Sequence, residues 1–460
     1  MAIATGLSTS SCNSPKVLQH QSGLHPPRHY CADKNIVIIG NFRWGCDMCA
    51  NVTHAQSGKP AKPSGDMQQA ARLFLELLSQ HFNRASLVVI DGDHQYSFGP
   101  AEGPALVLRV NRPDFYTHVL LQGNLGLGES YMSEGFDVDD GRLPELLIEL
   151  LKMKLDLKTG HNWRFVLRYG AIRLKNLIAG NVKNVRCHYD IGEELFDTFL
   201  LDRYHVYSCG YAQSPDADIE TLQCEKLERI CQKLELARDL TLLDIGCGEG
   251  GLLVHAALHF GVRGIGITNS RAHYERANAI INLHGLRDKI QVRLQNFQAI
   301  SGQYDRIVSV GMLEHLREHA YPHYFKKIAD ALLPGGRALV HTIGCNTHIN
   351  RHDPFIQRYI FPGSSTPKLS RICSLLELNC LAILDVENLV RHYAVTSRRW
   401  LEAFRTNAHR LDPARYEISF KRMWEYYLCC GIAAATAGEV ALYQVLFTND
   451  YHAPYRYQRI

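Results

Sequence analysis

The sequence has 460 residues, of which 46% are hydrophobic, and a formal net charge of +4. The length allows two domains, and the small net charge excludes a protein that selects its partners by overall charge. No apolar run approaches the ~20 residues that a membrane-spanning helix needs. The 14 cysteines are scattered, which favours reduced thiols in a cytoplasm-like compartment. One C-x-x-C pair, Cys46 and Cys49, has no second close pair after it, so we expect no metal site.

The first 150 residues divide into two parts. Residues 1–65 have little hydrophobic periodicity and contain "SGKPAKPSGD", so we expect a disordered leader and linker; the alternative, a transit peptide, is disfavoured because Arg28 is the only arginine before Asp33. Residues 66–150 predict a small α/β domain. "MQQAARLFLELLSQHF" has helical spacing, and "ASLVVIDGD" and "ALVLRVN" are typical of strands. The glycine-rich residues 122–140 predict a connection that leads into the helix "LPELLIELLKMKL".

Residues 151–187 form a basic segment. Asp156 is its only acidic residue, and aromatic residues such as Trp163 and Tyr169 lie among its cationic residues. An amphipathic cationic helix would suit an anionic membrane surface, and the alternative is a linker helix whose lysines face water. No recognised nucleic-acid module accompanies the charge, so we expect no nucleic-acid partner. The cationic residues are Lys152, Lys154, Lys158, Arg164, Arg168, Arg173, Lys175, Lys183 and Arg186.

Strands and helices alternate regularly from about residue 238. The predicted strands are "LTLLDIG", "VRGIGIT", "KIQVRLQ", "YDRIVSVG" and "RALVHTIG", with helices expected after Gly250, after Ser270 and near 318–332. This alternation predicts a parallel sheet covered by helices on both faces. The last part, 365–460, predicts two or three helices and the strand "EVALYQVLF".

The turn "DIGCGEGG" follows the first of these strands, where open α/β sheets bind ligands. Gly246, Gly248 and Gly250 remove side chains where the backbone must turn and approach a ligand. Their spacing differs from the G-x-G-x-x-G of dinucleotide-binding folds and is typical of S-adenosylmethionine (SAM) methyltransferases. A purely structural tight turn is the alternative.

Several further motifs follow one another in a characteristic order. They are "HYDIGEELFDTFL", "YHVYSCGYA", "LLDIGCGEGG", "DRIVSVGMLEHL", "LVHTIG", "YIFPGSSTPKL" and "NLVRHYAVTSRRW". From about residue 120 to the end, the chain resembles the cyclopropane-fatty-acyl-phospholipid synthase family, which includes mycolic acid cyclopropane synthases. The resemblance implies a class I SAM-dependent methyltransferase domain over 188–460, Rossmann-like with a mixed seven-stranded sheet. The smaller N-terminal α/β domain resembles the lipid-binding type of the bacterial members.

The resemblance also implies the reaction, a transfer of methylene from SAM across a cis double bond of a phospholipid acyl chain. An alkene is a poor nucleophile, so catalysis must depend on positioning and on excluding water. Ring closure needs a base, which the family resemblance identifies as a bound bicarbonate ion. The residues implied to hold it are Cys209, Glu314, His341, Ile343 and Tyr393.

Each of these five residues has a simpler interpretation alone. Cys209 and Ile343 would be core residues that contribute only backbone groups. Glu314 would cap a helix, His341 would be a satisfied core histidine, and Tyr393 would serve packing. Their occurrence together, in family order, favours the catalytic interpretation.

The implied SAM contacts carry three departures from the family pattern. Glu249 stands where tryptophan is usual, His273 where glutamine is usual and Asn296 where aspartate is usual. These departures weaken the SAM assignments around the adenine but leave the five base-site residues untouched. The implied SAM contacts are Tyr207, Ser208, Asp244, Gly246, Gly248, Thr268, Asn269, Gln295 and Asn296.

The alternatives concern chemistry and catalysis. One is a fatty-acyl C-methyltransferase that leaves a methyl or methylene branch, and another is a non-catalytic lipid-binding or SAM-binding relative. N-methylation of a small amine is disfavoured by the lipid-type domain and the basic segment. We expect a cytoplasmic protein, peripherally associated with the inner face of the membrane through anionic lipid. The resemblance further implies a homodimer formed through the N-terminal domain.

Overall fold

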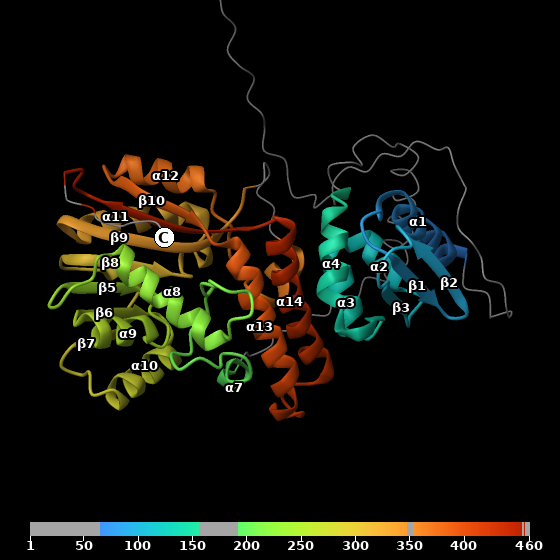
Figure 1. Cartoon of the computed structure of the whole chain (residues 1–460), viewed down its shortest axis with the longest axis horizontal. Helices are drawn as coiled ribbons and strands as arrows, with labels where there is room; N and C mark the ends of the chain where they lie inside the picture. The colour runs from blue at the N-terminus through green and yellow to red at the C-terminus, as the bar shows by residue number, and fades with distance from the viewer. Residues whose placement is uncertain (1–64, 156–191, 347–352, 453–454, 456–460) are drawn as a thin grey trace, which may run out of the picture. The chain divides into compact units, whose positions relative to one another are not determined.

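The computed structural model describes residues 65–155, 192–346, 353–452 and 455 (Figure 1). The expected leader, the Cys46–Cys49 pair and most of the basic segment therefore lie outside the described residues. Within these ranges, none of the helices combines the length and the apolar character needed to cross a bilayer.

The N-terminal domain is built on a four-stranded sheet of order β2-β1-β3-β4. Strand β1 pairs parallel with β3 and antiparallel with β2, and its alternate residues Leu87 and Val89 are buried. That alternation lets one face of the strand pack against the helices. The strands are β1 (Leu87–Asp91), β2 (His94–Phe98), β3 (Leu106–Val110) and β4 (Phe136–Val138); the helices are α1 (Gly65–His81), α2 (Phe115–Gln122), α3 (Asn124–Met132), η1 (Asp139–Gly141) and α4 (Leu143–Lys152).

The prediction of a glycine-rich connection over 122–140 was wrong, because most of this stretch is helix α3 followed by strand β4. Two of its glycines permit close packing instead of turning the chain. A Cβ on Gly126 would lie 2.0 Å from the carbonyl oxygen of His118, and one on Gly128 would lie 2.3 Å from the ring of Phe355. Glycine composition alone does not distinguish these two uses.

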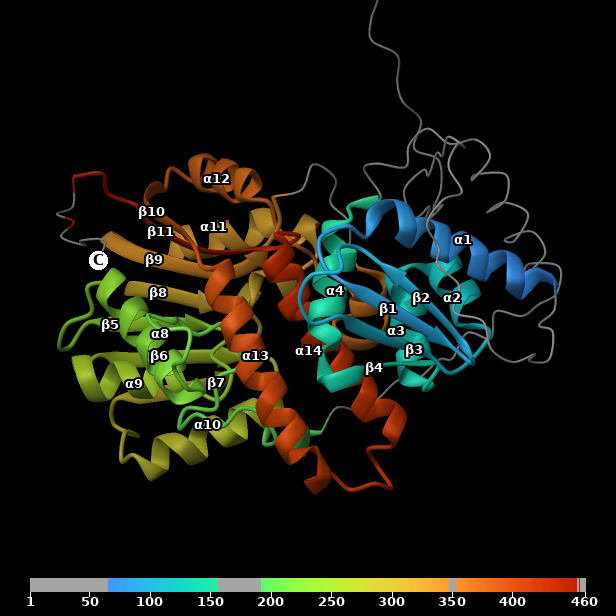
Figure 2. The same cartoon turned by 45° about the vertical axis from the view of Figure 1, so that its right-hand side comes forward.

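The C-terminal domain contains a seven-stranded sheet of order β10-β11-β9-β8-β5-β6-β7 (Figure 2). Strands β5 to β9 pair with one another in parallel, whereas β11 runs antiparallel to both of its neighbours, β9 and β10. The predicted mixed seven-stranded sheet is thus confirmed. The strands are β5 (Thr241–Ile245), β6 (Arg263–Thr268), β7 (Ile290–Leu294), β8 (Tyr304–Val310), β9 (Leu332–Gly344), β10 (Ala382–Asn388) and β11 (Ala441–Thr448).

Helices cover both faces of this sheet, as the strand alternation requires. Leu242, Val308 and Leu339 pack with α8, α9 and α10, while the following or preceding residues such as Leu243 and Val340 pack with α11 and α12 on the other face. The elements are α7 (Glu193–Phe196), α8 (Ile219–Lys233), α9 (Gly251–Phe260), α10 (Arg271–Leu283), η2 (Phe297–Ala299), η3 (Leu313–His315), η4 (Glu318–Ala320), α11 (Tyr321–Ala331), η5 (Ile356–Ile360), α12 (Leu369–Leu378), α13 (Val390–Asn407), η6 (Ala408–Arg410) and α14 (Ile418–Ala437).

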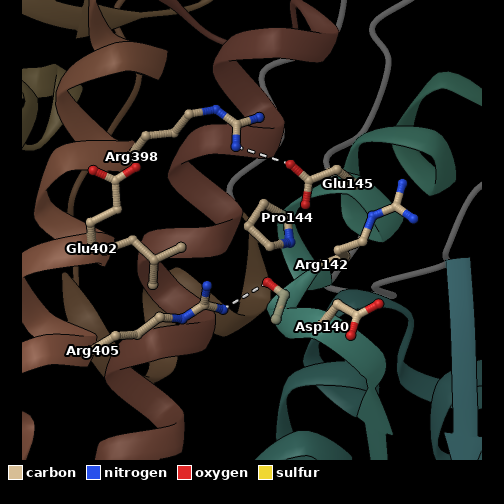
Figure 3. A pocket seen from close by; sticks show the side chains of 9 residues that line it. Asp140, Arg142, Pro144, Glu145, Arg398, Glu402 and Arg405 are labelled. Atoms are coloured by element: carbon tan, nitrogen blue, oxygen red, sulfur yellow. Dashed lines mark hydrogen bonds and ion pairs between the residues drawn. The ribbon is translucent and has the colours of Figure 1, made fainter. Parts of the chain in front are cut away.

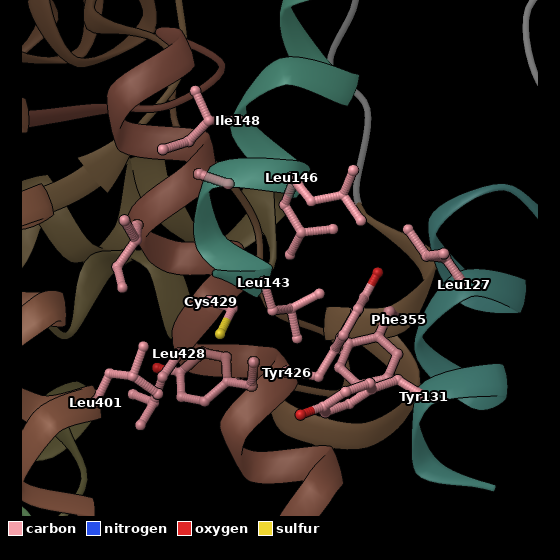
Figure 4. Close-up of a cluster of buried hydrophobic side chains, with 14 of the residues drawn as sticks. Leu127, Tyr131, Leu143, Leu146, Ile148, Phe355, Leu401, Tyr426, Leu428 and Cys429 are labelled. Carbon is pink, nitrogen blue, oxygen red and sulfur yellow. The ribbon is translucent and has the colours of Figure 1, made fainter. Parts of the chain in front are cut away.

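Helices α13 and α14 join the C-terminal domain to the N-terminal domain through one continuous core. Leu143, Leu146 and Tyr131 of the N-terminal domain pack in the same cluster as Tyr426 and Leu428 of α14 (Figure 4). An apolar seam of this kind buries both helix faces at once, so the two domains stabilise one another.

A cleft of about 310 Å³ lies beside this seam, lined by α13 and by residues 140–145 (Figure 3). Its arginines already have partners. Arg398 pairs with Glu145 at 2.9 Å, and Arg405 donates to the carbonyl oxygen of Gly141 at 2.9 Å and pairs with Glu425 at 2.7 Å. Through these contacts, Arg398 and Arg405 connect α13 to the N-terminal domain.

Candidate active site

The glycine turn follows β5, whose neighbours in the sheet are β8 on one side and β6 on the other. Gly246 and Gly248 have φ angles of 83° and 54°, which favour glycine. A Cβ on Gly248 would meet no atom within 4 Å, so this turn leaves open space above it. We call residues 246–250, with the ends of β6 and β7, the cofactor rim.

Asp244 lies near the end of β5 and is buried beside the Lys226 side chain of α8. Burial raises the pKa of Asp244 to about 7, although the charge of Lys226 opposes this rise. Burial also lowers the pKa of Lys226 to about 8. The pair keeps two opposite charges in a place where either charge alone would be costly.

The other predicted SAM contacts on the rim lie at the ends of β6 and β7. The Gln295 amide donates to the carbonyl oxygen of Thr268 at 2.9 Å, which holds the two strand ends together. Asn269 and Asn296 are exposed, and Asn296 Oδ1 accepts a hydrogen bond from the Gln298 amide at 2.9 Å. The Asn296 side chain therefore also caps the short helix η2.

The segment that carries Tyr207, Ser208 and Cys209 is held from α8. Lys226 Nζ donates to Ser208 Oγ at 3.0 Å, and Gln223 Nε2 donates to the Ser208 carbonyl oxygen at 2.9 Å. The Ser208 Cβ lies 4.0 Å from the position that a Cβ on Gly311 would take, so this segment closely approaches the end of β8.

Glu314 lies in η3, directly after β8, and is buried. Its Oε2 accepts a hydrogen bond from Thr342 Oγ1 at 2.7 Å, and its Oε1 accepts one from the Ile343 amide at 3.2 Å. Burial raises the pKa of the Glu314 carboxyl, while the charge of His315 and these hydrogen bonds act in the opposite direction. The carboxyl is thus fixed at the end of β9 by two hydrogen bonds.

His341 lies on β9 and is paired across the sheet with Gln444 of β11. His341 Nδ1 and Gln444 Nε2 share a hydrogen bond of 3.2 Å, whereas His341 Nε2 is buried and has no partner among the described residues. Burial, with the charges of Lys226 and Lys233, lowers the pKa of His341 to about 3. The imidazole is therefore neutral at neutral pH and keeps one nitrogen available for a ligand.

Tyr393 lies on α13 and is buried, with Cys209 and Glu314 among its electrostatic neighbours. Burial raises the pKa of Tyr393 well above its usual value, so its hydroxyl keeps the proton and acts as a donor. Tyr427 connects it to the SAM side, because the Tyr427 hydroxyl interacts with Tyr393 and lies 2.6 Å from the Tyr207 hydroxyl.

Cys209 is a buried neutral thiol. Its Sγ contacts the Gly210 carbonyl oxygen at 3.0 Å, and burial raises its pKa to about 12. A thiol that keeps its proton is a poor nucleophile. For Ile343, the other residue expected to act through its backbone, the amide donates to Glu314 Oε1. We call Cys209, Glu314, His341, Ile343 and Tyr393 the base site.

The structure shows which residues are contacted by Glu249, which stands where the family usually has tryptophan. Glu249 lies in the glycine turn with its side chain 9% exposed, and its Oε2 lies 3.1 Å from His205 Nδ1 and 3.2 Å from Arg276 Nε. A charged contact thus occupies the place for which an aromatic residue was expected. His273 is exposed, and its amide is bonded to Ser270 Oγ at the start of α10.

Sequence reasoning missed Lys226, Thr342, Gln444 and Tyr427. Two of them left a signal: Lys226 stands at helical spacing between the apolar Leu222 and Ile230, and Gln444 interrupts the apolar strand "ALYQVLF". A polar residue at a core position needs a hydrogen-bond partner, so its presence in the sequence indicates a buried polar contact. A threonine in a strand and a tyrosine in a buried helix are ordinary, so the other two left none.

Comparison with known proteins agrees with this geometry. The family model described as mycolic acid cyclopropane synthetase matches residues 178–445. The chain belongs to this family. The cyclopropane-fatty-acyl-phospholipid synthase of Escherichia coli K12 is 36% identical over 344 residues, which cover 74% of this chain and 87% of the relative.

Other relatives and solved structures fit the same family. A probable fatty acid methyltransferase of Pseudomonas putida is 32% identical over 272 residues, covering 57% of this chain and 68% of the relative. The cyclopropane synthase MmaA2 of Mycobacterium tuberculosis has a TM-score of 0.54 at 26% identity, covering 57% of this chain and 96% of its own. The predicted class I SAM-dependent methyltransferase fold is thereby confirmed, and the chain is an enzyme of the SAM-dependent synthases and methyltransferases.

Proposed function

We propose that the chain is a cyclopropane-fatty-acyl-phospholipid synthase that transfers methylene from SAM across a cis double bond of a phospholipid acyl chain. The observation that carries the proposal is the base site at the end of β9. The Glu314 carboxyl is fixed by two hydrogen bonds, His341 keeps a buried nitrogen that has no partner among the described residues, and the buried Tyr393 phenol has Glu314 among its electrostatic neighbours.

The base site suits a small oxyanion such as bicarbonate. His341 Nε2 and the Tyr393 hydroxyl can donate hydrogen bonds to it, and Glu314 can share a proton with it, because burial already raises the pKa of that carboxyl. When bound, SAM supplies the methyl group that becomes the bridge, and bicarbonate supplies the base that takes up one proton of that group. The hydrogen-bonded group of Glu314, Thr342 and Ile343 orients this base and excludes water from it.

The cofactor rim suits SAM. Gly246 and Gly248 remove side chains where the backbone approaches the ligand, and Gly248 faces open space. Asp244 supplies a carboxyl group whose ionised form is favoured by the charge of Lys226, and the segment of Tyr207 and Ser208 closes the side nearest to Gly311.

The lipid substrate brings the enzyme to a membrane surface. We infer peripheral contact with anionic lipid on the cytoplasmic inner face through the basic segment, and assembly as a homodimer through the N-terminal domain. Support comes from the sequence of the segment and from the family. Replacing Lys158, Arg164 and Arg168 with glutamine should weaken sedimentation with anionic vesicles, and more so at low salt. Unchanged sedimentation would exclude the segment.

The function is tested by mass spectrometry of fatty acids from unsaturated phospholipid vesicles incubated with the protein and isotope-labelled SAM. Addition of one CH2 with loss of the alkene is the expected result. An added carbon with retained unsaturation, or a saturated chain with a methyl branch, would establish a C-methyltransferase instead. Absence of labelled lipid, with SAM still bound, would overturn the proposed acceptor.

A further inference from the structure

Four ionisable side chains form a connected group at the cofactor rim. Glu249 lies 3.1 Å from His205 Nδ1 and 3.2 Å from Arg276 Nε. Asp197 completes the group, at 3.1 Å from both His205 Nε2 and the Arg276 terminal nitrogen. Each member thus contacts at least two of the others, and we call these four residues the rim network.

The rim network joins segments that are distant in the sequence. Glu249 belongs to the glycine turn, Arg276 to α10 after the end of β6, and Asp197 follows α7. His205 precedes Tyr207 by two residues, in the segment that α8 holds against the base site. The network therefore ties three walls of the proposed SAM site together.

The backbone at His205 is arranged for this contact. His205 has a φ angle of 52°, an unfavourable left-handed conformation for a residue with a Cβ. The buried Asp202 stabilises the turn, because its Oδ1 accepts hydrogen bonds from the amides of Tyr204 at 3.1 Å and Val206 at 3.2 Å. A strained residue that is fixed by a buried carboxylate and directed at the glycine turn indicates a functional constraint.

We propose that Glu249 and Arg276 act as a latch that holds the segment 197–209 closed over the glycine turn and so slows release of the bound cofactor. The inference rests on the proposed SAM site. Glu249 is a positioning residue here, since its carboxylate is directed at His205 and Arg276. The pair is partly buried, so its attraction is screened less than that of an exposed pair.

The test measures binding of S-adenosylhomocysteine to the full chain by calorimetry, with dissociation followed by stopped flow. Glu249→Gln and Arg276→Gln should each weaken binding by about three- to tenfold, mostly through faster dissociation. The double variant should bind more weakly than either single one, because Glu249 contacts His205 and Arg276 contacts Asp197, so each substitution removes a different contact with the segment. Raising the salt from about 0.05 M to about 0.5 M should weaken binding by the wild type more than by Glu249→Gln.

Arg271→Gln is the matched control, because Arg271 lies on the same helix and its contact with Glu275, at 3.7 Å, is exposed. It should leave binding unchanged, and thermal unfolding should show that all variants are folded.

Two outcomes would overturn the latch. One is unchanged affinity in both single variants, and the other is tighter SAM binding by Arg276→Gln, which would mean that Glu249 attracts the cationic cofactor directly. Absence of binding by the wild type would instead refute the SAM site, and the latch with it.

Discussion

The base site and the cofactor rim lie at the same edge of the sheet, but their charges are compensated in different ways. Glu314 and His341 are buried and depend on neutral partners, namely Thr342, the Ile343 amide and Gln444. The rim network uses ion pairs, and one of its members, Asp197, is 54% exposed. Neutral hydrogen bonds in a dry site are insensitive to salt and fix geometry, whereas ion pairs near water can open and close. This difference supports the proposed function, in which the base stays bound while the cofactor exchanges at each turnover.

The largest expected effect is on the base site. Glu314→Gln should lower turnover by about 10³-fold, because the amide cannot share a proton with the bound base. Affinity for S-adenosylhomocysteine should stay within about threefold of the wild type, since the rim is untouched. Turnover is measured by incorporation of labelled methyl groups into lipid, with the exposed Glu318→Gln as control. Wild-type turnover in the Glu314 variant would refute the assigned base site.

The second effect concerns stability and pH. The folded-state pKa of His341 is about 3, below its ordinary value of 6.5, so the unfolded chain binds the extra proton between these values. The free energy of unfolding should therefore decrease as the pH falls below 6.5, by up to about 1.4 kcal/mol per pH unit from this group. In urea titrations, the free energy of unfolding of His341→Gln should decrease less steeply with falling pH than that of the wild type. The exposed His319→Gln should behave like the wild type. Parallel curves for all three proteins would show that His341 is not held neutral.

The third effect is a shift of pH dependence at the rim. Burial raises the pKa of Asp244 to about 7, and Lys226 limits this rise. Binding of S-adenosylhomocysteine should tighten as Asp244 ionises, that is, as the pH rises through about 7. Lys226→Met removes the positive neighbour and should move this midpoint to higher pH, while Asp244→Asn should abolish it. Calorimetry between about pH 5.5 and 9 measures the midpoint. An unchanged midpoint in Lys226→Met would show that the lysine does not influence the pH dependence of cofactor binding.

The smallest effect is expected at the exposed part of the rim. Asn296→Ala should weaken cofactor binding by less than about threefold, because its side chain is exposed and also caps η2. Loss of the cap should destabilise the protein by about 1 kcal/mol. Equilibrium binding and urea unfolding separate the two effects. A loss of binding above tenfold, without a change in stability, would show that Asn296 is a main cofactor contact.

The parts of the fold that could be predicted are those with a simple pattern. The parallel strands β5 to β9 are apolar runs between helices, and the glycine turn is explicit in the sequence. Strand β10 was missed because Asp385 and Glu387 interrupt its apolar pattern. Both pair with Lys233, whose side chain is fully buried, at 3.0 Å and 2.7 Å, and such a long-range pair leaves no local trace.

The candidate site divides in the same way. The expected site residues could be identified from motifs in the sequence. The residues that hold them in place by hydrogen bonds could not. Thr342 and Gln444 act through contacts with residues 28 and 103 positions away. Which nitrogen of His341 stays unpartnered depends on the pairing of β9 with β11, and only the folded sheet defines that.

The core shared by α4 and α14 limits how this protein can be divided or recombined. Leu143 and Leu146 have their packing partners on helix α14, nearly 300 positions later in the chain. Cutting the chain between the domains would expose an apolar face on each fragment, and such faces promote aggregation. A chimera that takes its N-terminal domain from a relative should therefore avoid aggregation only if the residues of α14 that pack against that domain are exchanged with it.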